Sequence, residues 1–181
     1  MKVAVLYARP RSVYHQIEGC DVFDARRDAR SYRGRLPVIA HPPCRAWGRL
    51  AHMSKATTEE RQLAFHAVGA VRRCGGVLEH PAWSSLWREA GLPLPGEPLD
   101  AAGGWTLPVF QGHAGHRAPK DTWLYIVGIN RRALPSFPFG LGHPPGRVEL
   151  MGKREREATP PDFARWLVDL ATACDRREVE P

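Results

Sequence analysis

The sequence His41-Pro42-Pro43-Cys44 places a thiol directly behind the apolar run 36–40. An apolar run of this length predicts a buried strand, and the two prolines after it fix φ and remove backbone donors. Such a stiff turn loses little further freedom when a substrate docks. Because ligands of open α/β sheets bind at the carboxyl ends of the strands, Cys44 is a candidate nucleophile. The alternative, a small buried hydrophobic residue at a strand end, is equally consistent with this motif.

A second strand-end signal supplies a carboxyl group, because Glu79-His80-Pro81 follows the short apolar run 77–78. A free thiol is only slightly ionised at neutral pH and needs a nearby cation, for which His41 and Arg45 are the candidates. A thiolate beside a carboxylic acid could add to an electron-poor ring while the acid protonates a ring nitrogen. Considered alone, Glu79 could equally form a salt bridge with an arginine at the strand end.

The order of these motifs resembles that of the DNA (cytosine-5) methyltransferases, over about residues 20–171. In that family a strand ends in Pro-Cys and the cysteine attacks C6 of cytosine, and Pro43-Cys44 matches this element. The next strand of the family ends in Glu-Asn-Val, whose glutamate contacts N3. Residues 79–81 resemble that element with two departures.

Two later segments extend the resemblance. The family's Gln-x-Arg-x-Arg strand is similar to residues 119–128, where Lys120 stands in the place of the glutamine and Thr122 in that of an arginine. Residues 156–161, which precede a helical pattern, are similar to the Arg-x-Leu-Thr-x-Arg-Glu element. The overall pattern is also similar to small phage-encoded proteins, which implies the cytoplasm of a bacterium or of a phage-infected host cell.

The resemblance implies a transferase that modifies C5 of a cytosine-type pyrimidine, in DNA or as a nucleotide, through a covalent adduct. Cys44 would form the adduct and Glu79 would protonate N3. The implied substrate-binding residues are Pro43, Arg45, Trp47, His80, Lys120 and Thr122. The implied partner is single-stranded or duplex DNA, or a pyrimidine nucleotide.

The loop after the first strand departs from the family. Members carry a Phe-x-Gly-x-Gly loop there, whose glycines let the backbone approach S-adenosylmethionine, whereas this chain has residues 7–12 without glycine. Arg9 and Arg11 in this loop favour an anionic ligand over a sulfonium. Asp24 could still hold a ribose hydroxyl, as acidic residues do in dinucleotide folds. S-adenosylmethionine therefore stays a possible cofactor only, and a non-catalytic nucleic-acid or protein-binding module with the same fold is the alternative function.

Composition points to one globular domain. The chain has 181 residues, of which 43% are hydrophobic and 25% charged, and its net charge of +7 favours a polyanionic partner. Its four scattered cysteines lack a CxxC pair, which indicates a reducing cytoplasm. No apolar run approaches the roughly 20 residues that span a membrane, and the N-terminal segment is too short for a signal peptide. We expect one domain over 1–175, with a Pro/Gly-rich insertion at about 92–118 and a frayed tail at 176–181.

The apolar patterns predict the elements that position these side chains. Strands are expected at 3–7, 20–24, 37–40, 77–79 and 122–128, and helices at 58–74, 81–91 and 160–171. Thr57 and Glu60 form a capping box for the first helix, and Thr159 is the expected N-cap of the last. This alternation predicts an α/β three-layer sandwich with a mainly parallel sheet, Rossmann-like and truncated. No metal site is expected, because His113 and His116 match no standard zinc spacing.

Overall fold

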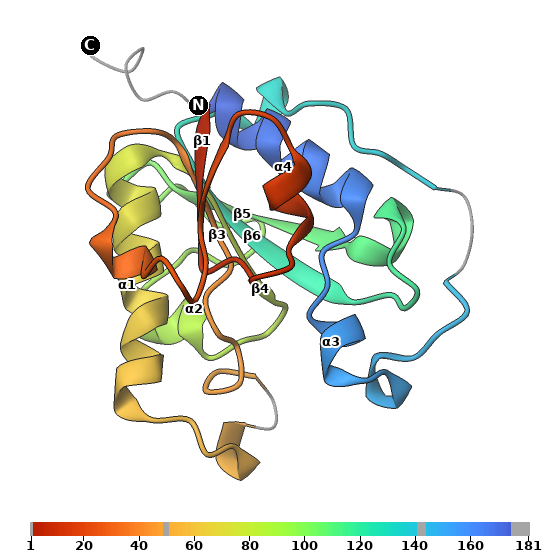
Figure 1. Cartoon of the computed structure of the whole chain (residues 1–181). Coiled ribbons are helices and arrows are strands. Elements are labelled where there is room, and N and C mark those ends of the chain that lie inside the picture. The colour runs from red at the N-terminus through yellow and green to blue at the C-terminus, as the bar shows by residue number, and fades with distance from the viewer. Residues whose placement is uncertain (1, 49–50, 141–143, 175–181) are drawn as a thin grey trace.

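The computed structural model describes residues 2–48, 51–140 and 144–174. Across these residues six strands form one sheet in the order β2-β1-β3-β4-β6-β5 (Figure 1). The strands are β1 (Val3–Leu6), β2 (Cys20–Phe23), β3 (Val38–Ala40), β4 (Gly76–Pro81), β5 (Trp105–Phe110) and β6 (Asp121–Val127). The expected tail at 176–181 lies outside the described residues.

The expectation of a mainly parallel sheet is wrong, because the sheet is mixed. β1 pairs in parallel with β2 and β3, and β3 with β4, whereas β6 is antiparallel to both β4 and β5. Consecutive strands joined by a short connection can only pair antiparallel, while parallel neighbours need a long crossover. The connection 111–120 between β5 and β6 is short, so this part of the chain forms a hairpin.

The chain reverses its direction of winding between β1 and β3. It runs from β1 to β2 on one side and then returns, so that β3 pairs with the other side of β1. Crevices at such a reversal are where open α/β sheets bind ligands. The ends of β1, β3 and β4 and the start of β6 lie on the same edge of the sheet, which we call the carboxyl edge.

Helices pack against both faces of the sheet (Figure 1). The α-helices are α1 (Thr58–Cys74), α2 (Leu86–Glu89), α3 (Lys153–Arg156) and α4 (Pro161–Ala173). The 3-10 helices are η1 (Val13–Gln16), η2 (Ala29–Ser31), η3 (Ala51–Met53), η4 (Gln111–Ala114), η5 (Arg131–Ala133) and η6 (Val148–Leu150). The predicted start of α1 is confirmed, since the Thr57 hydroxyl accepts a hydrogen bond from the Glu60 amide at 3.2 Å.

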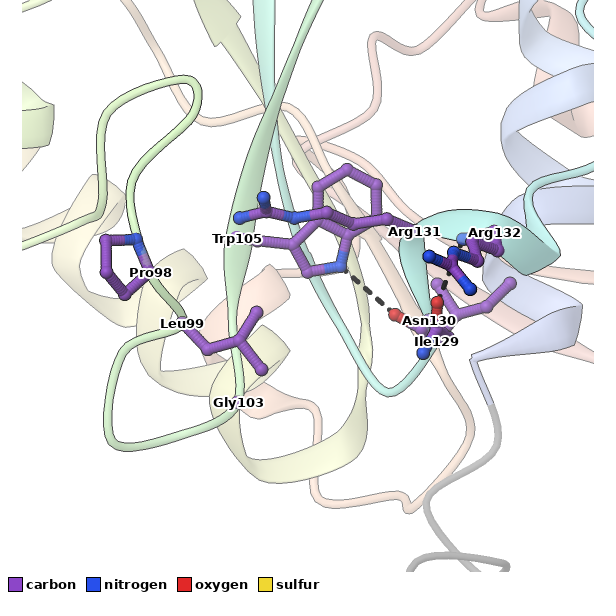
Figure 2. A pocket seen from close by; sticks show the side chains of 8 residues that line it. All are labelled: Pro98, Leu99, Gly103, Trp105, Ile129, Asn130, Arg131 and Arg132. Atoms are coloured by element: carbon purple, nitrogen blue, oxygen red, sulfur yellow. Dashed lines mark hydrogen bonds between the residues drawn. The ribbon is translucent and has the colours of Figure 1, made fainter.

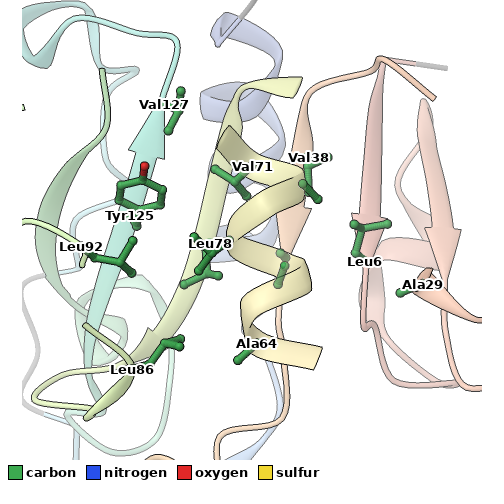
Figure 3. Close-up of a cluster of buried hydrophobic side chains, with 14 of the residues drawn as sticks. Leu6, Ala29, Val38, Ala64, Val71, Leu78, Leu86, Leu92, Tyr125 and Val127 are labelled. Carbon is green, nitrogen blue, oxygen red and sulfur yellow. The ribbon is translucent and has the colours of Figure 1, made fainter. Parts of the chain in front are cut away.

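Each face of the sheet has its own hydrophobic core. The stripe of α1 that includes Ala64 and Val71 packs on one face with Leu78 and Leu86, as Figure 3 shows. On the other face the apolar side of α4 packs on alternate residues of the same strands, such as Val77. A fully buried leucine contributes about 1.5–3 kcal/mol relative to an exposed one, so these two clusters hold the strands, and hence their ends, in fixed positions.

One glycine is required for the sheet to close. Gly76 begins β4 with φ 113°, and a Cβ placed there would lie 2.1 Å from the Val38 carbonyl oxygen of β3. No side chain fits at that distance. Gly75, with φ 77°, ends α1 just before it. The Gly75-Gly76 pair therefore lets the chain turn from α1 directly into a strand beside β3.

Three element boundaries differ from the sequence expectation. The predicted helix at 81–91 shrinks to α2, because the antiparallel pairing of β4 with β6 continues through Pro81 opposite Thr122. The N-cap of α4 is Pro160, one residue later than Thr159. Residues 105–110, inside the expected insertion, form the edge strand β5.

Candidate functional site

Backbone strain gathers at the carboxyl edge. Among the described residues, three that are not glycine have a left-handed backbone: Tyr7 (φ 62°), Trp83 (φ 62°) and Lys120 (φ 39°). Tyr7 follows β1, Trp83 follows β4, and Lys120 precedes β6. Such conformations cost about 1–3 kcal/mol each and concentrate where a structure holds a functional group in place. Their common location marks this edge as the candidate site.

A buried hydrogen-bond network surrounds Glu79 at this edge. His41 Nδ1 lies 3.0 Å from Glu79 Oε2, and His41 Nε2 lies 3.0 Å from the Tyr14 hydroxyl. Gln111 Nε2 donates to Glu79 Oε1 at 2.8 Å and to the Thr122 hydroxyl at 2.9 Å. The side chains of His41 and Glu79 are only 13% and 12% exposed. Four segments of the chain thus orient one carboxylate.

The charges around Glu79 keep it ionised. Burial alone would raise the pKa of Glu79, but the Lys120 ammonium and the His41 hydrogen bond outweigh it and lower the pKa to about 2. Burial and the Glu79 charge raise the pKa of Tyr14 well above its usual range, so Tyr14 stays a phenol. The network therefore has a direction: Tyr14 can donate to His41 Nε2, and His41 Nδ1 donates to Glu79.

Cys44 is a half-buried thiol at the same edge, in the turn that follows β3. Burial raises its pKa, and so do the charges of Glu79 and Glu157, while Lys120 acts in the opposite direction. The two cations expected to activate Cys44 are engaged elsewhere, since Arg45 binds Glu60 and His41 faces Glu79. At neutral pH the thiol is consequently protonated while the carboxyl group is not.

The segment 153–158 approaches the same edge from the other end of the chain. Lys120 Nζ donates to the Ala158 carbonyl at 3.4 Å. Arg9 Nη1 donates to the Arg154 carbonyl at 3.0 Å and lies 3.3 Å from the Glu157 carboxylate. The loop after β1, the approach to β6 and the segment before α4 are therefore held together, and the charges of Lys120 and Glu157 act on the Cys44 thiol.

Two of the predicted substrate-binding residues lie in the interior instead. Trp47 is 1% exposed, packs on Phe65 at 5.3 Å and has the Arg61 guanidinium 4.1 Å from its ring centre. His80 is fully buried on the face opposite Glu79 and lies 6.2 Å from the Trp87 ring. Burial lowers the pKa of His80 to about 4, so it is neutral, and neither of its ring nitrogens has a hydrogen-bond partner among the described residues.

The other predicted residues also fall into two groups, those at the site and those buried or bound to other side chains. Lys120 lies at the site, because its charge acts on both Cys44 and Glu79. Thr122 is 1% exposed, and its hydroxyl is used between Gln111 and the Lys120 carbonyl, so it positions Gln111. Arg45 is exposed at the start of the turn and is bound by Glu60. Pro43 is half-buried beside Cys44.

Asp24, the candidate ribose ligand, caps its own loop. Its Oδ1 accepts from the amides of Arg26 at 2.8 Å and Arg27 at 3.2 Å, and its Oδ2 lies 3.7 Å from His15 Nε2. The hydrogen bond from the Arg26 amide is the main cause that lowers the pKa of Asp24. Its position at the end of β2 fits the expectation, but both of its oxygens already have partners.

Sequence reasoning missed Tyr14 and Gln111, and it interpreted Trp83, four residues before Trp87, as a core residue, whereas its side chain is exposed. Gln111 follows β5, which was not predicted as a strand because glycines precede it and Pro108 lies within it. Proline is tolerated in an edge strand such as β5, and the alternation around it was the available signal. The positive φ that exposes Trp83 had no counterpart in the sequence.

A hollow of about 360 Å³ lies at the opposite edge of the sheet, between the start of β5 and the segment after β6 (Figure 2). There the Trp105 ring nitrogen donates to the Ile129 carbonyl at 3.1 Å and Arg131 lies 5.3 Å from the ring centre. None of the predicted site residues lines it. The part of the chain that the structure describes contains no group of three or more metal-ligating side chains and no helix able to cross a membrane.

Comparison with protein-family models, with curated proteins and with solved structures found no match to this chain. The candidate site is therefore interpreted from its own geometry and from the sequence motifs.

Proposed function

We propose that the carboxyl edge binds a cytosine-type pyrimidine, in DNA or as a nucleotide, and modifies its C5 through a Cys44 adduct. The observation that carries the proposal is the convergence of Cys44, Glu79 and Lys120, which reach one edge from three separate segments. The charges of Glu79 and Lys120 act on the Cys44 thiol, and the Lys120 charge acts on Glu79. We further propose that the sheet is a truncated Rossmann-like, methyltransferase-type sandwich. The reversal between β1 and β3 and the helices on both faces support this.

The protonated Cys44 thiol and the ionised Glu79 carboxylate together supply the one proton that such an addition needs. The sulfur–C6 bond forms as the S–H bond breaks, and N3 gains the proton, so the thiol adds across the conjugated C6–C5–C4–N3 system. Glu79 relays that proton from sulfur to N3 and returns to the carboxylate. C5 is then an enamine carbon that attacks an electrophilic one-carbon donor, whose leaving group departs with the electron pair of the broken bond. A base removes the C5 proton as the C6–sulfur bond breaks, and N3 returns its proton through Glu79 to the Cys44 thiolate, which releases the neutral modified base.

The acceptors at the site favour a base with an amino group at C4. An ionised carboxylate accepts from the N4 amino group of cytosine and repels the O4 oxygen of thymine or uracil. The buried Oε1 of Gln111, on the side chain that holds Glu79, has no partner among the described residues. A buried acceptor without a partner costs about 1–3 kcal/mol, which a donor-bearing ligand would offset.

A donor-independent experiment tests the proposal. If Cys44 adds reversibly to C6, the enamine takes a solvent proton at C5, and reversal exchanges the original hydrogen. Incubation of deoxycytidine oligonucleotides or deoxycytidine monophosphate in D₂O should therefore give deuterium at C5, read by mass spectrometry. Adducts with 5-fluorocytosine should map to Cys44.

The controls separate the nucleophile from other thiols. Cys44→Ala should abolish both the exchange and the adduct, while Cys20→Ala, at another half-buried cysteine, should retain them. Absence of exchange and of adduct with every substrate form and donor would overturn the proposal.

The second candidate function is a non-catalytic nucleic-acid-binding module. The raised pKa of the Cys44 thiol and the arginine loop after β1 favour it. This candidate predicts that Cys44→Ala binds DNA as tightly as the original chain. It also predicts that affinity falls steeply with added salt, because binding would rest on phosphate contacts.

A further inference from the structure

Trp83 exposes a large aromatic ring at the carboxyl edge. Its side chain is 81% exposed, although an indole is normally among the more buried side chains. Its backbone is left-handed, with φ 62°, which a bulky residue adopts only under strain. The chain thus holds an apolar ring in water at a conformational cost, next to the candidate site.

A cluster of tilted and edge-to-face aromatic rings holds this indole. The Trp83 ring centre lies 4.8 Å from that of Trp123, which in turn lies 5.4 Å from that of Trp87. Trp123 and Trp87 are 5% and 1% exposed, and the Trp87 ring nitrogen donates to the Thr106 hydroxyl at 2.9 Å. One side of the Trp83 ring therefore rests on a fixed core, and much of the rest of its surface faces solvent.

The turn that carries Trp83 is joined to the Cys44 turn. The Ser85 amide donates to the Trp47 carbonyl at 3.0 Å, and the Trp47 amide donates to the Cys44 carbonyl at 3.0 Å. The Ala82 amide donates to the Asp121 carbonyl at 3.1 Å, which fixes the other end of the turn to β6. The exposed ring therefore borders the edge at which Cys44 and Glu79 lie.

We propose that Trp83 is a stacking platform for a base next to the target pyrimidine in a single-stranded nucleic acid. The inference rests on the proposed function and names its substrate class. A base offers a flat π face to any aromatic ring, so stacking binds single strands without reading sequence. Charge agrees with this ligand, because Lys120 and Arg9 lie at the same edge and the chain carries a net charge of +7.

The test measures binding of a fluorescein-labelled deoxycytidine 12-mer and of deoxycytidine monophosphate. Trp83→Ala should weaken 12-mer binding by about 10- to 100-fold, the usual effect of removing one stacking side chain. Trp83→Phe should restore part of the loss. The monophosphate, which has no neighbouring base, should bind both proteins equally.

Leu99→Ala is the matched control, because Leu99 is a 58% exposed apolar side chain that borders the hollow at the opposite edge. It should leave binding of the 12-mer unchanged. Equal 12-mer binding by the Trp83→Ala protein would overturn the platform, and so would a 12-mer that the original chain does not bind. Self-association that is lost in Trp83→Ala, without binding of the 12-mer, would identify a protein contact instead.

Deuterium exchange at C5 of the monophosphate separates the two proposals. Exchange that persists in Trp83→Ala while 12-mer binding is unaffected by the substitution would refute the platform alone. Exchange absent from the original chain, with every substrate form, would refute the proposed chemistry.

Discussion

At neutral pH the Cys44 thiol is protonated and the Glu79 carboxyl group is ionised, because the surroundings raise the pKa of the thiol and lower that of the carboxyl group. Glu79 is ionised because Lys120 and His41 outweigh the effect of burial on its pKa. Its negative charge in turn helps to raise the pKa of Cys44. The charge state expected from the motif, an ionised thiol beside a protonated acid, is thus reversed before any substrate binds.

The sequence predicted that Cys44, Glu79 and Lys120 lie at one end of the sheet, but it could not predict their charges. Cys44, Glu79 and Lys120 follow from strand ends and motif order. The network through Tyr14 and Gln111 depends on contacts between segments far apart in the chain, so no local pattern announces it. Trp47 and His80 were assigned to the substrate because they neighbour these motifs, and their burial was not visible in the sequence.

Substitution of either charged neighbour should move the pKa of Cys44. Glu79→Gln removes a negative charge, so we expect a lower pKa and faster alkylation by iodoacetamide at pH 8. Lys120→Met removes a positive charge, so we expect a higher pKa and slower alkylation. The rate against pH at each cysteine is read by mass spectrometry of peptides. Cys20, whose pKa burial raises, is the reference within each sample and should not change. Identical profiles for Cys44 in all three proteins would show that these charges do not reach the thiol.

Among the elements, the loop after β1 is the one that would have to bind S-adenosylmethionine. Tyr7 takes the left-handed backbone that glycine adopts without strain, and its hydroxyl lies 2.8 Å from His66 Nδ1. The Ala8 amide donates to the Phe23 carbonyl of β2 at 3.1 Å. Arg9 is paired with Glu157, so the loop is filled by its own side chains and their partners.

We therefore expect weak or absent binding of S-adenosylmethionine to the free protein. Arg9, Pro10 and Arg11 occupy the loop that glycine would leave open, and Pro10 also lacks a backbone donor. A sulfonium gains nothing from neighbouring guanidinium groups. Isothermal titration calorimetry measures this directly. Tight stoichiometric binding that Asp24→Ala abolishes would show that the loop takes a cofactor as the methyltransferases do.

Two element boundaries show when a local sequence pattern is enough to predict where an element begins. The start of α1 was predicted because its signal is local: Thr57 caps the helix through the Glu60 amide three residues later. The helix expected from Pro81 was wrong because pairing with β6 draws Pro81 into the sheet. That pairing joins residues about forty positions apart in the chain. A proline that begins helices elsewhere therefore ends a strand here.

For the whole molecule, the sheet combines four strands predicted as a parallel set with a hairpin, of which the strand β6 was predicted and the strand β5 was not. β2, β1, β3 and β4 are the parallel strands that the apolar runs indicated, and β3, which precedes Cys44, pairs with β4, which carries Glu79. The hairpin of β5 and β6 makes the sheet mixed. It supplies Lys120, and Gln111 lies in the connection between its strands, so the hairpin completes the network around Glu79.

Buried ionisable groups near this edge should make the fold sensitive to acid in two separate pH windows. Burial lowers the pKa of His80 from its usual 6.5 to about 4, so the unfolded chain binds more protons in this range and stability falls as the pH falls through it. Glu79, with a pKa lowered from 4.5 to about 2, stabilises the fold above pH 4.5 and loses this contribution as the pH falls toward 2.

The upper window can be assigned to His80 by urea denaturation at pH 7, 5.5 and 4. His80→Leu keeps an apolar side chain against Trp87 and removes the titrating group. Each unit of pH in this window costs the original chain about 1.4 kcal/mol through His80. The difference in free energy of unfolding between the two proteins should therefore shift by about 3 kcal/mol in favour of the variant between pH 7 and pH 4. His66, whose pKa burial also lowers, is present in both proteins and cancels in this difference. Curves that stay parallel from pH 7 to pH 4 would mean that His80 is protonated as easily in the folded chain as in the unfolded one, and that its ring is not held in a dry interior.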